Sequence, residues 1–451
     1  MKFHHPEAVA ILKDHGVFIK NNVARFTEDQ ILHWIRKAPS YFNLFARNPE
    51  NNIVIGKNHI EVAPPYGCPT VTEKNGTKRK GTIADYIKMA KLFQVNTDFH
   101  INGGLMVQPH NIDIPTSCLV MFYLALTHSD KIMLITAGKK EYMEAVMACA
   151  ATLFGKKGAL KEHPCLCTIV NTNSPLHLDA TMTDVLLTFA RNGQPFAATN
   201  GAMAGFTSPM TLAGTLAIAN AEVLATIALT EMVNPGTPVI YGSQCTVADM
   251  KTGQMACGSA EGVICAKYIS LLSDFYGLPS RGGGALTDAK LPDAQAGMES
   301  MMMLMTNYAN NTNLIIHAAG ILDSYLSISF EKMILDFEIL RYIKRFSREI
   351  EMNDDTIPLN LIDEVGHEGE FLTKEHTLDH CRTEPLLRRI ASCGKVANQL
   401  HQIDLNMEIE YRRLMDGYKK PEVDGTKLEE IKYILTEFDI NRSLLNQIDT
   451  M

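Results

Sequence analysis

The segment between residues 282 and 299 holds the densest set of side chains that could do chemistry. It opens with the glycine run Gly282, Gly283, Gly284, where the absence of side chains lets the backbone lie against a ligand. Asp288 and Glu299 follow, with the amide of Gln295 between them. Carboxylates and an amide beside such a loop are typical of a binding pocket. We therefore expect the glycines to contact a cofactor, Asp288 and Glu299 to be catalytic, and Gln295 to contact a substrate.

The same segment also has a purely structural explanation. A flexible glycine loop leads into a predicted helix, and Asp293 at the start of that helix would stabilise the helix dipole. The residue types alone favour neither explanation.

Histidines near the C-terminus offer a different chemistry. His376 and His380 stand four positions apart on a predicted helix, with Cys381 beside them and His367 upstream. Such a group could bind zinc with tetrahedral geometry. The spacing matches no known zinc signature, however, and a polar helix with solvated histidines explains it more simply. We expect no metal on this chain.

The elements that must position these residues follow a regular pattern, in which eight short β-rich runs alternate with longer helical runs. Parallel strands joined by crossover helices produce this pattern. The predicted strands lie near residues 60–63, 99–107, 131–136, 165–170, 195–199, 238–241, 277–280 and 313–317. The predicted helices lie near residues 83–93, 115–128, 141–154, 179–192, 211–232, 259–276, 292–308 and 330–346.

Eight such pairs are the number that closes a barrel without leaving a sheet edge. We therefore predict an α/β protein with a (β/α)₈ TIM barrel over residues 60–350. Residues 1–59 are expected to form an N-terminal helical cap followed by a hairpin around Gly56-Lys57-Asn58, and residues 351–451 a C-terminal helical extension. An open doubly wound sheet is the alternative, but it would require a glycine-rich turn where Pro64 and Pro65 stand.

Composition excludes several classes of function. The 451 residues carry a formal net charge of -8 without a long basic stripe, which argues against nucleic acid as a ligand. Ten cysteines without a C-x₂-C pair are typical of reduced thiols in a cytoplasm. The N-terminus lacks the apolar core of a signal peptide, and the apolar run 211–232 carries Asn220, Glu222 and Glu231. We expect a cytoplasmic protein in which this run is a packed helix and no segment spans a membrane.

Several separated motifs resemble the trimethylamine methyltransferase family. Besides the segment 282–299, they are Asn200-Gly201, Gly205 to Thr215, Ala219 to Glu222, Pro238 to Gly242 and the early Pro64 to Gly67. They occur in order over most of the chain, which makes them far more specific than a single glycine pattern. The resemblance implies a (β/α)₈ barrel and methyl transfer from an amine to the cobalamin-type corrinoid of a separate partner protein.

Family members that act on trimethylamine use pyrrolysine in the barrel, whereas this sequence contains only the twenty common residues. The difference indicates the branch that acts on quaternary amines such as glycine betaine, proline betaine, carnitine or butyrobetaine.

A pocket for such a substrate should offer aromatic faces to the cationic head and hydrogen-bond donors to the substrate's own carboxylate. Candidates for substrate binding follow the predicted strands or lie in the extension; they are Tyr66, Phe206, Tyr241, Phe371, Arg281 and His317. Each aromatic residue taken singly is more often a core residue than a cage residue.

Two alternatives remain open on the sequence. One is a metal-dependent barrel lyase or hydrolase that uses the group His367, His376 and His380, and the other is a non-catalytic betaine-binding protein. A homo-oligomer that uses the helical ends as contact surfaces is also expected.

Overall fold

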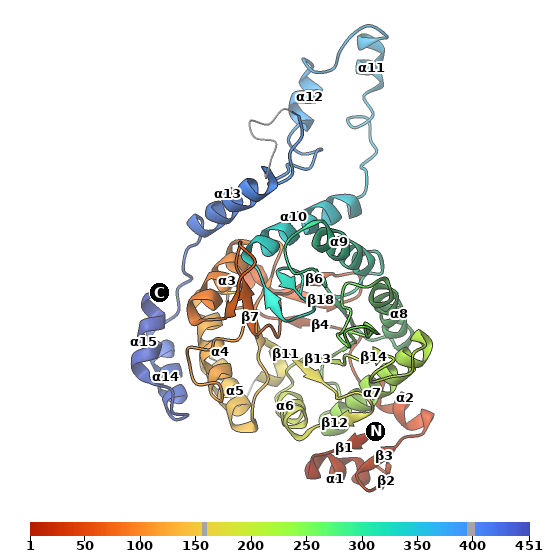
Figure 1. The fold of residues 1–451 in the computed structure, drawn as a ribbon, viewed down its shortest axis with the longest axis vertical. Helices are drawn as coiled ribbons and strands as arrows, with labels where there is room; N and C mark the ends of the chain where they lie inside the picture. Colours follow the sequence, from red (N-terminus) through yellow and green to blue (C-terminus); the bar gives the residue numbers. More distant parts are fainter. Residues whose placement is uncertain (156–159, 395–401) are drawn as a thin grey trace.

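The computed structural model describes residues 1–155, 160–394 and 402–451. An eight-stranded parallel sheet forms its centre and is seen end-on in Figure 1. Its strands are β6 (Glu61–Val62), β9 (Ile101–Gly103), β10 (Ile132–Ile135), β11 (Leu166–Asn171), β13 (Phe196–Thr199), β15 (Val239–Gly242), β17 (Ser280–Gly283) and β18 (Leu314–Ile316).

The sheet curls into an almost closed barrel because the first strand, β6, pairs in parallel with the last, β18. Within the described ranges, β6 and β9 are the one pair of neighbours without a ladder. Pro64 and Pro65 follow β6 directly, and proline has no backbone N–H to donate to a ladder. The predicted (β/α)₈ barrel is confirmed, and the open sheet is wrong.

Eight helices surround the strands, one after each strand (Figure 1). They are α3 (Ile83–Val95), α4 (Ser117–His128), α5 (Lys140–Phe154), α6 (Ala180–Arg191), α7 (Leu212–Val233), α8 (Ala260–Tyr276), α9 (Ala294–Ala309) and α10 (Phe330–Ser347). The predicted boundaries agree closely except at β9, which ends four residues earlier than predicted, and at β17, which begins three residues late. Gly277 causes the shift, because its left-handed backbone (φ 68°) ends α8 there.

The barrel interior is apolar at the N-terminal ends of the strands. A hairpin of β4 (Tyr41–Leu44) and β5 (Ile53–Gly56) covers that end. Its side chains pack on the inward-facing strand residues in one buried cluster, which includes Phe42, Leu44, Ile53, Ile55, Ile101, Ile132, Leu134, Ile169, Ile240, Leu314 and Ile316. The opposite end, which we call the mouth, is left for polar side chains, as in other barrel enzymes.

The N-terminal cap differs from the expected helices. It contains α1 (Pro6–Asp14) and α2 (Glu28–Ile35), but also the antiparallel pair β2 (Phe18–Lys20) and β3 (Val23–Arg25). Asn21 and Asn22 both have positive φ, which makes the tight turn that such a hairpin requires. The expected hairpin around Gly56 is reduced to a single antiparallel bridge between Gly56 and His59, and the extended pairing of β5 is with β4 instead.

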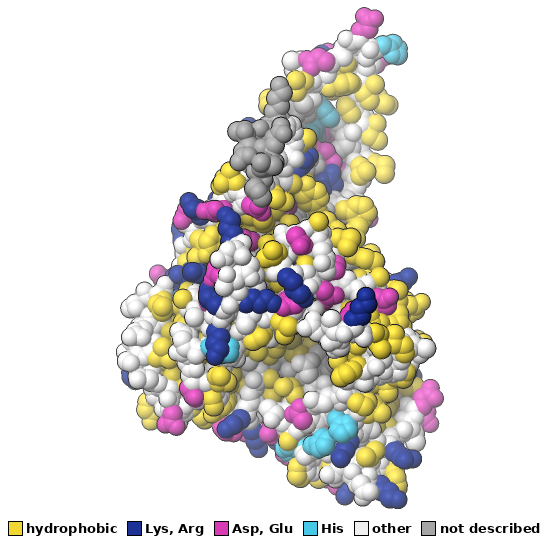
Figure 2. All heavy atoms as spheres, viewed as in Figure 1, with side chains coloured by type: hydrophobic (Ala, Val, Ile, Leu, Met, Phe, Trp, Pro, Cys, Tyr) yellow, Lys and Arg dark blue, Asp and Glu magenta, His cyan; other side chains and the backbone are white. Residues whose placement is uncertain are grey.

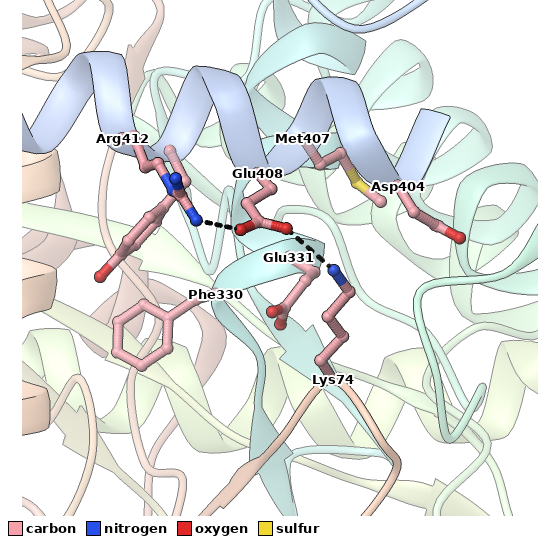
Figure 3. Close-up of a pocket in the computed structure, with 8 residues that line it drawn as sticks. Lys74, Phe330, Glu331, Asp404, Met407, Glu408 and Arg412 are labelled. Atoms are coloured by element: carbon pink, nitrogen blue, oxygen red, sulfur yellow. Dashed lines mark hydrogen bonds and ion pairs between the residues drawn. The ribbon is translucent and has the colours of Figure 1, made fainter. Parts of the chain in front are cut away.

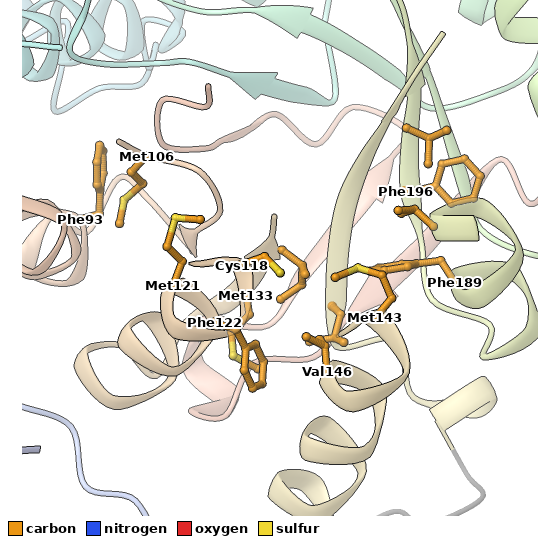
Figure 4. Packing of buried hydrophobic residues seen from close by; sticks show 14 of the residues in the cluster. Phe93, Met106, Cys118, Met121, Phe122, Met133, Met143, Val146, Phe189 and Phe196 are labelled. Atoms are coloured by element: carbon orange, nitrogen blue, oxygen red, sulfur yellow. The ribbon is translucent and has the colours of Figure 1, made fainter. Parts of the chain in front are cut away.

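A second core fills the space between the strands and the surrounding helices. Figure 4 shows part of it, in which Met143 of α5 and Phe189 of α6 lie near Phe196 of β13, and Met121 of α4 lies near Met106. These side chains are almost fully buried. Because both faces of the strands are covered, the strands are held rigidly and can position residues at the mouth.

The long apolar helix α7 satisfies the length and hydropathy of a membrane span, with a mean hydropathy of 1.7 over its most apolar window. More than half of that window is buried inside the protein, and α7 packs against α1, α2, α6 and α8. This agrees with the packed helix expected from the sequence.

The C-terminal extension is helical, as expected. Residues 348–394, which we call the arm, project from the barrel and include α11 (Leu359–Val365) and α12 (Glu375–His380) (Figure 1). The chain then returns along the outside of the barrel, where α13 (Gln402–Asp416) packs on α3 and α10, α14 (Gly425–Thr436) on α5, and α15 (Arg442–Thr450) on α4. The division of the chain at residues 59/60 and 350/351 stays a prediction.

The buried His128 at the end of α4 gives the fold a pH dependence. Burial, together with the charge of Lys420, lowers the pKa of His128 from its ordinary value to about 4, and its Nε2 has no partner among the described residues. The neutral form therefore stabilises the folded state above about pH 6.5, and this contribution is lost as the pH falls towards 4. We expect the wild type to lose about 2 kcal/mol more than His128→Gln between pH 7 and pH 5.

Melting temperatures of the two proteins across this pH range measure the difference. Parallel curves for wild type and variant would contradict the assignment.

Candidate active site

A cavity of about 280 Å³ opens at the mouth of the barrel. Its volume lies at the small end of the range for ligand pockets, which indicates a small substrate. Its lining comes from the loops and strand ends at the mouth and consists of Tyr66, Gly67, Ile169, Asn171, Thr199, Asn200, Gly201, Gln244, Met255, Arg281, His317 and Tyr325. None of these described residues carries a carboxylate.

Arg281 is the one permanent cation in this lining. It pairs with Leu314 in the ladder between β17 and β18, and Leu314 belongs to the interior cluster, so Arg281 also faces inward. The side chain is 3% exposed. Its guanidinium donates to Oε1 of Gln244 at 3.4 Å, and its Nε has no partner among the described residues. Burial lowers the pKa of Arg281, but the group stays charged because arginine is so basic.

Two glycines leave space for the side chains of Arg281 and Gln244. A Cβ at Gly242 would stand 2.7 Å from Cβ of Arg281, and a Cβ at Gly283 would stand 2.3 Å from Oε1 of Gln244. Neither distance is tolerated by real side chains. The glycine that ends the motif Pro238 to Gly242 therefore makes space for Arg281.

His317 lies at the end of β18 and is held in an unusual backbone conformation, with φ 65°. Its Nδ1 accepts the backbone N–H of Tyr66 at 3.1 Å, so its proton sits on Nε2 in the neutral ring. Burial and the charge of Arg281 hold the pKa of His317 well below its ordinary value. His317 is thus a neutral donor that faces the cavity.

Tyr325 is one of several lining residues that the sequence analysis missed; others are Asn171, Thr199, Gln244 and Met255. Tyr325 belongs to a turn between β19 (Ile321–Leu322) and β20 (Ser327–Ile328) in which Asp323, Ser324 and Tyr325 all have positive φ. Its ring meets that of His317 edge-on at 4.9 Å. Its hydroxyl lies close to the guanidinium of Arg281 but makes no hydrogen bond of ordinary geometry. Backbone strain of this kind is common at functional sites.

Polar contacts with neighbouring loops hold this strained turn in place. Asp323 forms ion pairs with Lys78 and Lys290. The hydroxyl of Ser324 donates to Oδ1 of Asp288 at 2.6 Å. The turn therefore presents Tyr325 to the cavity in one position.

Asp288 and Glu299, the expected catalytic pair, lie in the wall behind Tyr325 and do not line the cavity. Asp288 accepts the N–H of Cys257 at 2.8 Å, and its own N–H donates to Glu299 at 2.8 Å. Burial and the charge of Glu299 raise the pKa of Asp288. The pair joins three mouth loops, which is the geometry of positioning residues, and the expected catalytic role stays a prediction.

Tyr66 offers an aromatic face to the cavity. Its hydroxyl accepts the N–H of Ala137 at 3.2 Å, and burial raises the pKa of Tyr66 to about 12. Tyr66 and Tyr325 are therefore neutral rings, suited to contact a cationic head.

The buried Glu222 explains the motif Ala219 to Glu222. Its carboxylate accepts hydrogen bonds from the hydroxyl of Thr172 at 2.6 Å, the N–H of Leu176 at 2.7 Å and Nδ2 of Asn200 at 2.8 Å. These groups belong to the loops after β11 and β13. The motif therefore fixes two sides of the mouth and does not contact a substrate itself.

The remaining predicted substrate residues lie elsewhere. Tyr241 faces outward from β15, where its hydroxyl donates to Asn220 of α7 at 2.8 Å. Phe206 is 70% exposed on the rim, and Phe371 lies in the arm. Gln295 is exposed on α9 and donates to Glu299 at 2.9 Å. None of the four side chains lines the cavity, because strand alternation and loop direction turn them away from it, and their contact with a substrate stays a prediction.

The glycines Gly282 to Gly284 are also not free to contact a cofactor. All three are buried. A Cβ at Gly282 would collide with Asn307, and a Cβ at Gly284 with the carbonyl oxygen of His317. Asp293, in turn, caps α9 by accepting the N–H of Ala296 at 3.0 Å. Most of the segment 282–299 thus serves close packing, as its structural explanation proposed.

A larger groove of about 390 Å³ lies on the rim between α13, the start of α10 and the turn between β7 (Thr70–Thr72) and β8 (Lys78–Lys80) (Figure 3). Lys74 donates to Glu408 at 3.1 Å, and Arg412 pairs with the same carboxylate. These three charges are therefore paired with one another, and no strand end of the barrel reaches the groove. We place the active site in the mouth cavity.

The expected histidine group is brought together only in part. Donor atoms of Asp355, His376 and His380 lie within 4.8 Å of one another, whereas His367 is not in the group. The group lies on the arm, far from the barrel mouth (Figure 1). A metal-dependent barrel enzyme would need its metal at the mouth, so this alternative gains no support from the described residues.

Comparison with known proteins identifies the family. Residues 1–437 match the family model described as trimethylamine methyltransferase (MTTB). The chain is 37% identical over 430 residues to a glycine betaine methyltransferase of Desulfitobacterium hafniense (strain Y51), which covers 94% of this chain and 89% of that protein. It is 28% identical over 453 residues to a proline betaine:corrinoid methyltransferase of Eubacterium limosum. That match covers 97% of this chain and 93% of that protein.

The crystal structure of the Methanosarcina barkeri monomethylamine methyltransferase (MtmB) matches this fold with a TM-score of 0.51 at 10% identity, over 95% of this chain and 85% of that one. At this identity the likeness supports the barrel alone. The family match and the sequence identities go further, and they confirm what the motifs predicted: the chain is a methyltransferase that belongs to the trimethylamine methyltransferase family.

Proposed function

We propose that the chain transfers a methyl group from a carboxylated quaternary amine, of the glycine betaine type, to the cobalt of a corrinoid carried by a separate protein. The observation that carries the substrate class is Arg281, a buried guanidinium with no carboxylate partner among the described residues. Burying an unpaired charge is costly, and a substrate carboxylate would pair with it. The relatives named for glycine betaine and proline betaine support the same class.

The reaction requires little acid–base catalysis by side chains of this protein. A quaternary nitrogen already carries its charge, so the electrons of the broken C–N bond return to nitrogen and a neutral tertiary amine leaves without a proton. A reduced corrinoid supplies Co(I) as the nucleophile. The chain's task is to orient the methyl group towards the mouth, which is catalysis by proximity.

Two groups of lining residues can orient the substrate in this way. Arg281 and Nε2 of His317 can donate to the substrate carboxylate, and so can the hydroxyl of Thr199, which is buried without a partner in the described part of the chain. Tyr66 and Tyr325 can contact the cationic head with their ring faces. A cation without a carboxylate would keep the ring contacts but would also meet the uncompensated charge of Arg281.

The mouth leaves room for a flat group to approach. A Cβ at Gly67 would meet no atom within 4 Å, and a Cβ at Gly201 only Cε of Met255 at 3.8 Å. Both glycines line the cavity and border open space, which fits a planar corrin ring at the mouth. The buried glycines 282–284 do not fit this role.

The rim of the mouth carries exposed apolar side chains on five separate loops that follow strands. They are Ile114, Phe206, Met210, Met250, Leu291 and Leu326, which are between 42% and 73% exposed. Figure 2 shows the hollow that the mouth loops surround. Apolar groups around a cavity are typical of a protein-binding surface, and the corrinoid protein must cover this opening.

We expect Phe206→Asp and Met250→Asp to lower kcat/KM for the corrinoid protein by about 10-fold each, as for residues at the centre of an interface. Transfer to free cob(I)alamin should change less than about twofold, because the cavity is intact. Phe275→Asp is the matched control. Phe275 is 78% exposed near the C-terminal end of α8, which lies away from the mouth. Equal losses of kcat/KM with free cob(I)alamin and with the corrinoid protein would refute this surface as the binding site of the corrinoid protein.

The proposed function is tested by mixing purified protein, glycine betaine and a reduced corrinoid protein. We expect the Co(I) absorbance to be replaced by that of methyl-cobalt(III), with dimethylglycine formed in equal amount. Tight glycine betaine binding without any transfer would instead favour the non-catalytic binding protein.

A homo-oligomer and a cytoplasmic location stay predictions. The exposed apolar side chains of the arm support the first, because a second copy could cover them.

A further inference from the structure

The arm has almost no hydrophobic core of its own. Its helices α11 and α12 span seven and six residues, which is too short for stability in isolation. Of its large apolar side chains, Val365 and Ile390 are buried, whereas the exposed ones are Ile350, Met352, Ile357, Leu359, Ile362, Phe371, Leu372, Leu378 and Leu387. Figure 2 shows apolar groups along the edge of the arm. Units with so small a core are usually stabilised by disulfides or metals, and Cys381 and Cys393 are both free.

A set of metal-ligand side chains lies in this arm. His376 and His380 occupy positions i and i+4 of α12 and so share one face of the helix. Both rings turn towards Asp355. Nε2 of His380 lies 3.2 Å from Oδ2 of Asp355, and Nε2 of His376 lies 2.9 Å from its carbonyl oxygen. The two imidazole rings are 4.3 Å apart between centroids.

We propose that Asp355, His376 and His380 form a zinc site that fastens α12 to the turn at residues 353–357. Zinc binds imidazole nitrogen and carboxylate oxygen at about 2.0–2.2 Å, which puts tetrahedral donor atoms roughly 3.3 Å apart. The distance between His380 and Asp355 already has this value, and all three donor atoms lie within 4.8 Å of one another. Rotation of the His376 side chain closes the remaining gap, and water takes the fourth position.

The backbone supports this arrangement. Oδ1 of Asn353 accepts the N–H groups of Asp355 and Thr356 at 3.0 and 2.9 Å, which fixes the turn that presents Asp355. The sequence spacing alone did not predict the site, because Asp355 stands 21 positions before His376 and only the fold brings them together.

Zinc is titrated calorimetrically into untagged full-length protein that has been treated with chelator. We expect one equivalent per chain, and at least about 10-fold weaker binding in His376→Ala and in His380→Ala. His367→Ala is the matched control, because His367 belongs to the same arm but lies outside the group. Its zinc affinity should equal that of the wild type.

Limited proteolysis gives a second readout that does not depend on catalysis. Zinc should slow cleavage within residues 348–394 in the wild type and in His367→Ala, but not in His376→Ala. All these variants should keep their methyl-transfer activity, since the arm lies away from the cavity. The absence of stoichiometric binding, or binding that persists unchanged in His376→Ala and His380→Ala, would overturn the proposal.

Discussion

Replacing Arg281 by methionine is expected to lower kcat/KM for glycine betaine by about two to three orders of magnitude. The variant keeps the volume of the side chain but removes the partner proposed for the substrate carboxylate. Losing one member of a buried charge pair costs about 3–4 kcal/mol in the transition state, which corresponds to this factor. Steady-state transfer to a corrinoid protein measures the loss.

Although the activity of Arg281→Met should fall, its stability should not. In the ligand-free protein the guanidinium is buried and its Nε has no partner within the described ranges, so methionine removes a desolvation penalty. We expect an unchanged or higher melting temperature for Arg281→Met. Arg281→Lys should retain part of the activity, since lysine keeps the charge but loses the planar fork. Full activity of the methionine variant would refute the assigned role.

The second large effect is expected at a buried ion pair on α10. Lys332 is fully buried, and its Nζ donates to Asp336 at 2.6 Å and to the hydroxyl of Ser300 at 2.8 Å. Asp336 in turn accepts the N–H of Gly320 at 2.7 Å. Lys332→Met should destabilise the protein by about 3–5 kcal/mol, because it leaves a buried carboxylate without its cation. Thermal unfolding and soluble yield report the effect.

Two variants make this prediction specific. Lys332→Met combined with Asp336→Leu should recover much of the stability, since no charge is then left unpaired. Lys344→Met on the same helix is the control. Lys344 pairs with Asp98 at 2.7 Å on the surface, where such a pair contributes at most about 1 kcal/mol. Equal losses for Lys332→Met and Lys344→Met would contradict the account.

The barrel could be predicted from the sequence because each strand and helix has its own local signal. The periodicity of apolar residues changes between strand and helix eight times, and residues such as Gly277 and Pro64 mark where elements end. Pairing over long distances has no such signal. The β4–β5 pairing and the return of the chain along the outside of the barrel after the arm were therefore not foreseen.

The site could be predicted only in part. Tyr66, Arg281 and His317 meet in one cavity because each follows or ends a strand and faces inward. In the ladder between β15 and β17, Gly242 pairs with Arg281, so Tyr241 stands one residue earlier and its side chain points the opposite way. Tyr325 was missed because its turn follows the eighth strand without any motif.

The carboxylates show a second limit of sequence reasoning. Asp288 and Glu299 have the residue types of a catalytic pair, yet their oxygen atoms accept hydrogen bonds from the loops around them. Residue type alone does not distinguish a carboxylate that reacts from one that positions a neighbour. Here the position of both carboxylates outside the cavity lining favours the positioning role.

The central claim is that a buried guanidinium selects quaternary amines that carry a carboxylate. Glycine betaine and choline test it most directly, because they share the trimethylammonium head and differ in the group that would meet Arg281. We predict that methyl transfer to a reduced corrinoid protein is at least about 100-fold more efficient from glycine betaine. Equal kcat/KM for the two amines, or a preference for choline, would contradict this account.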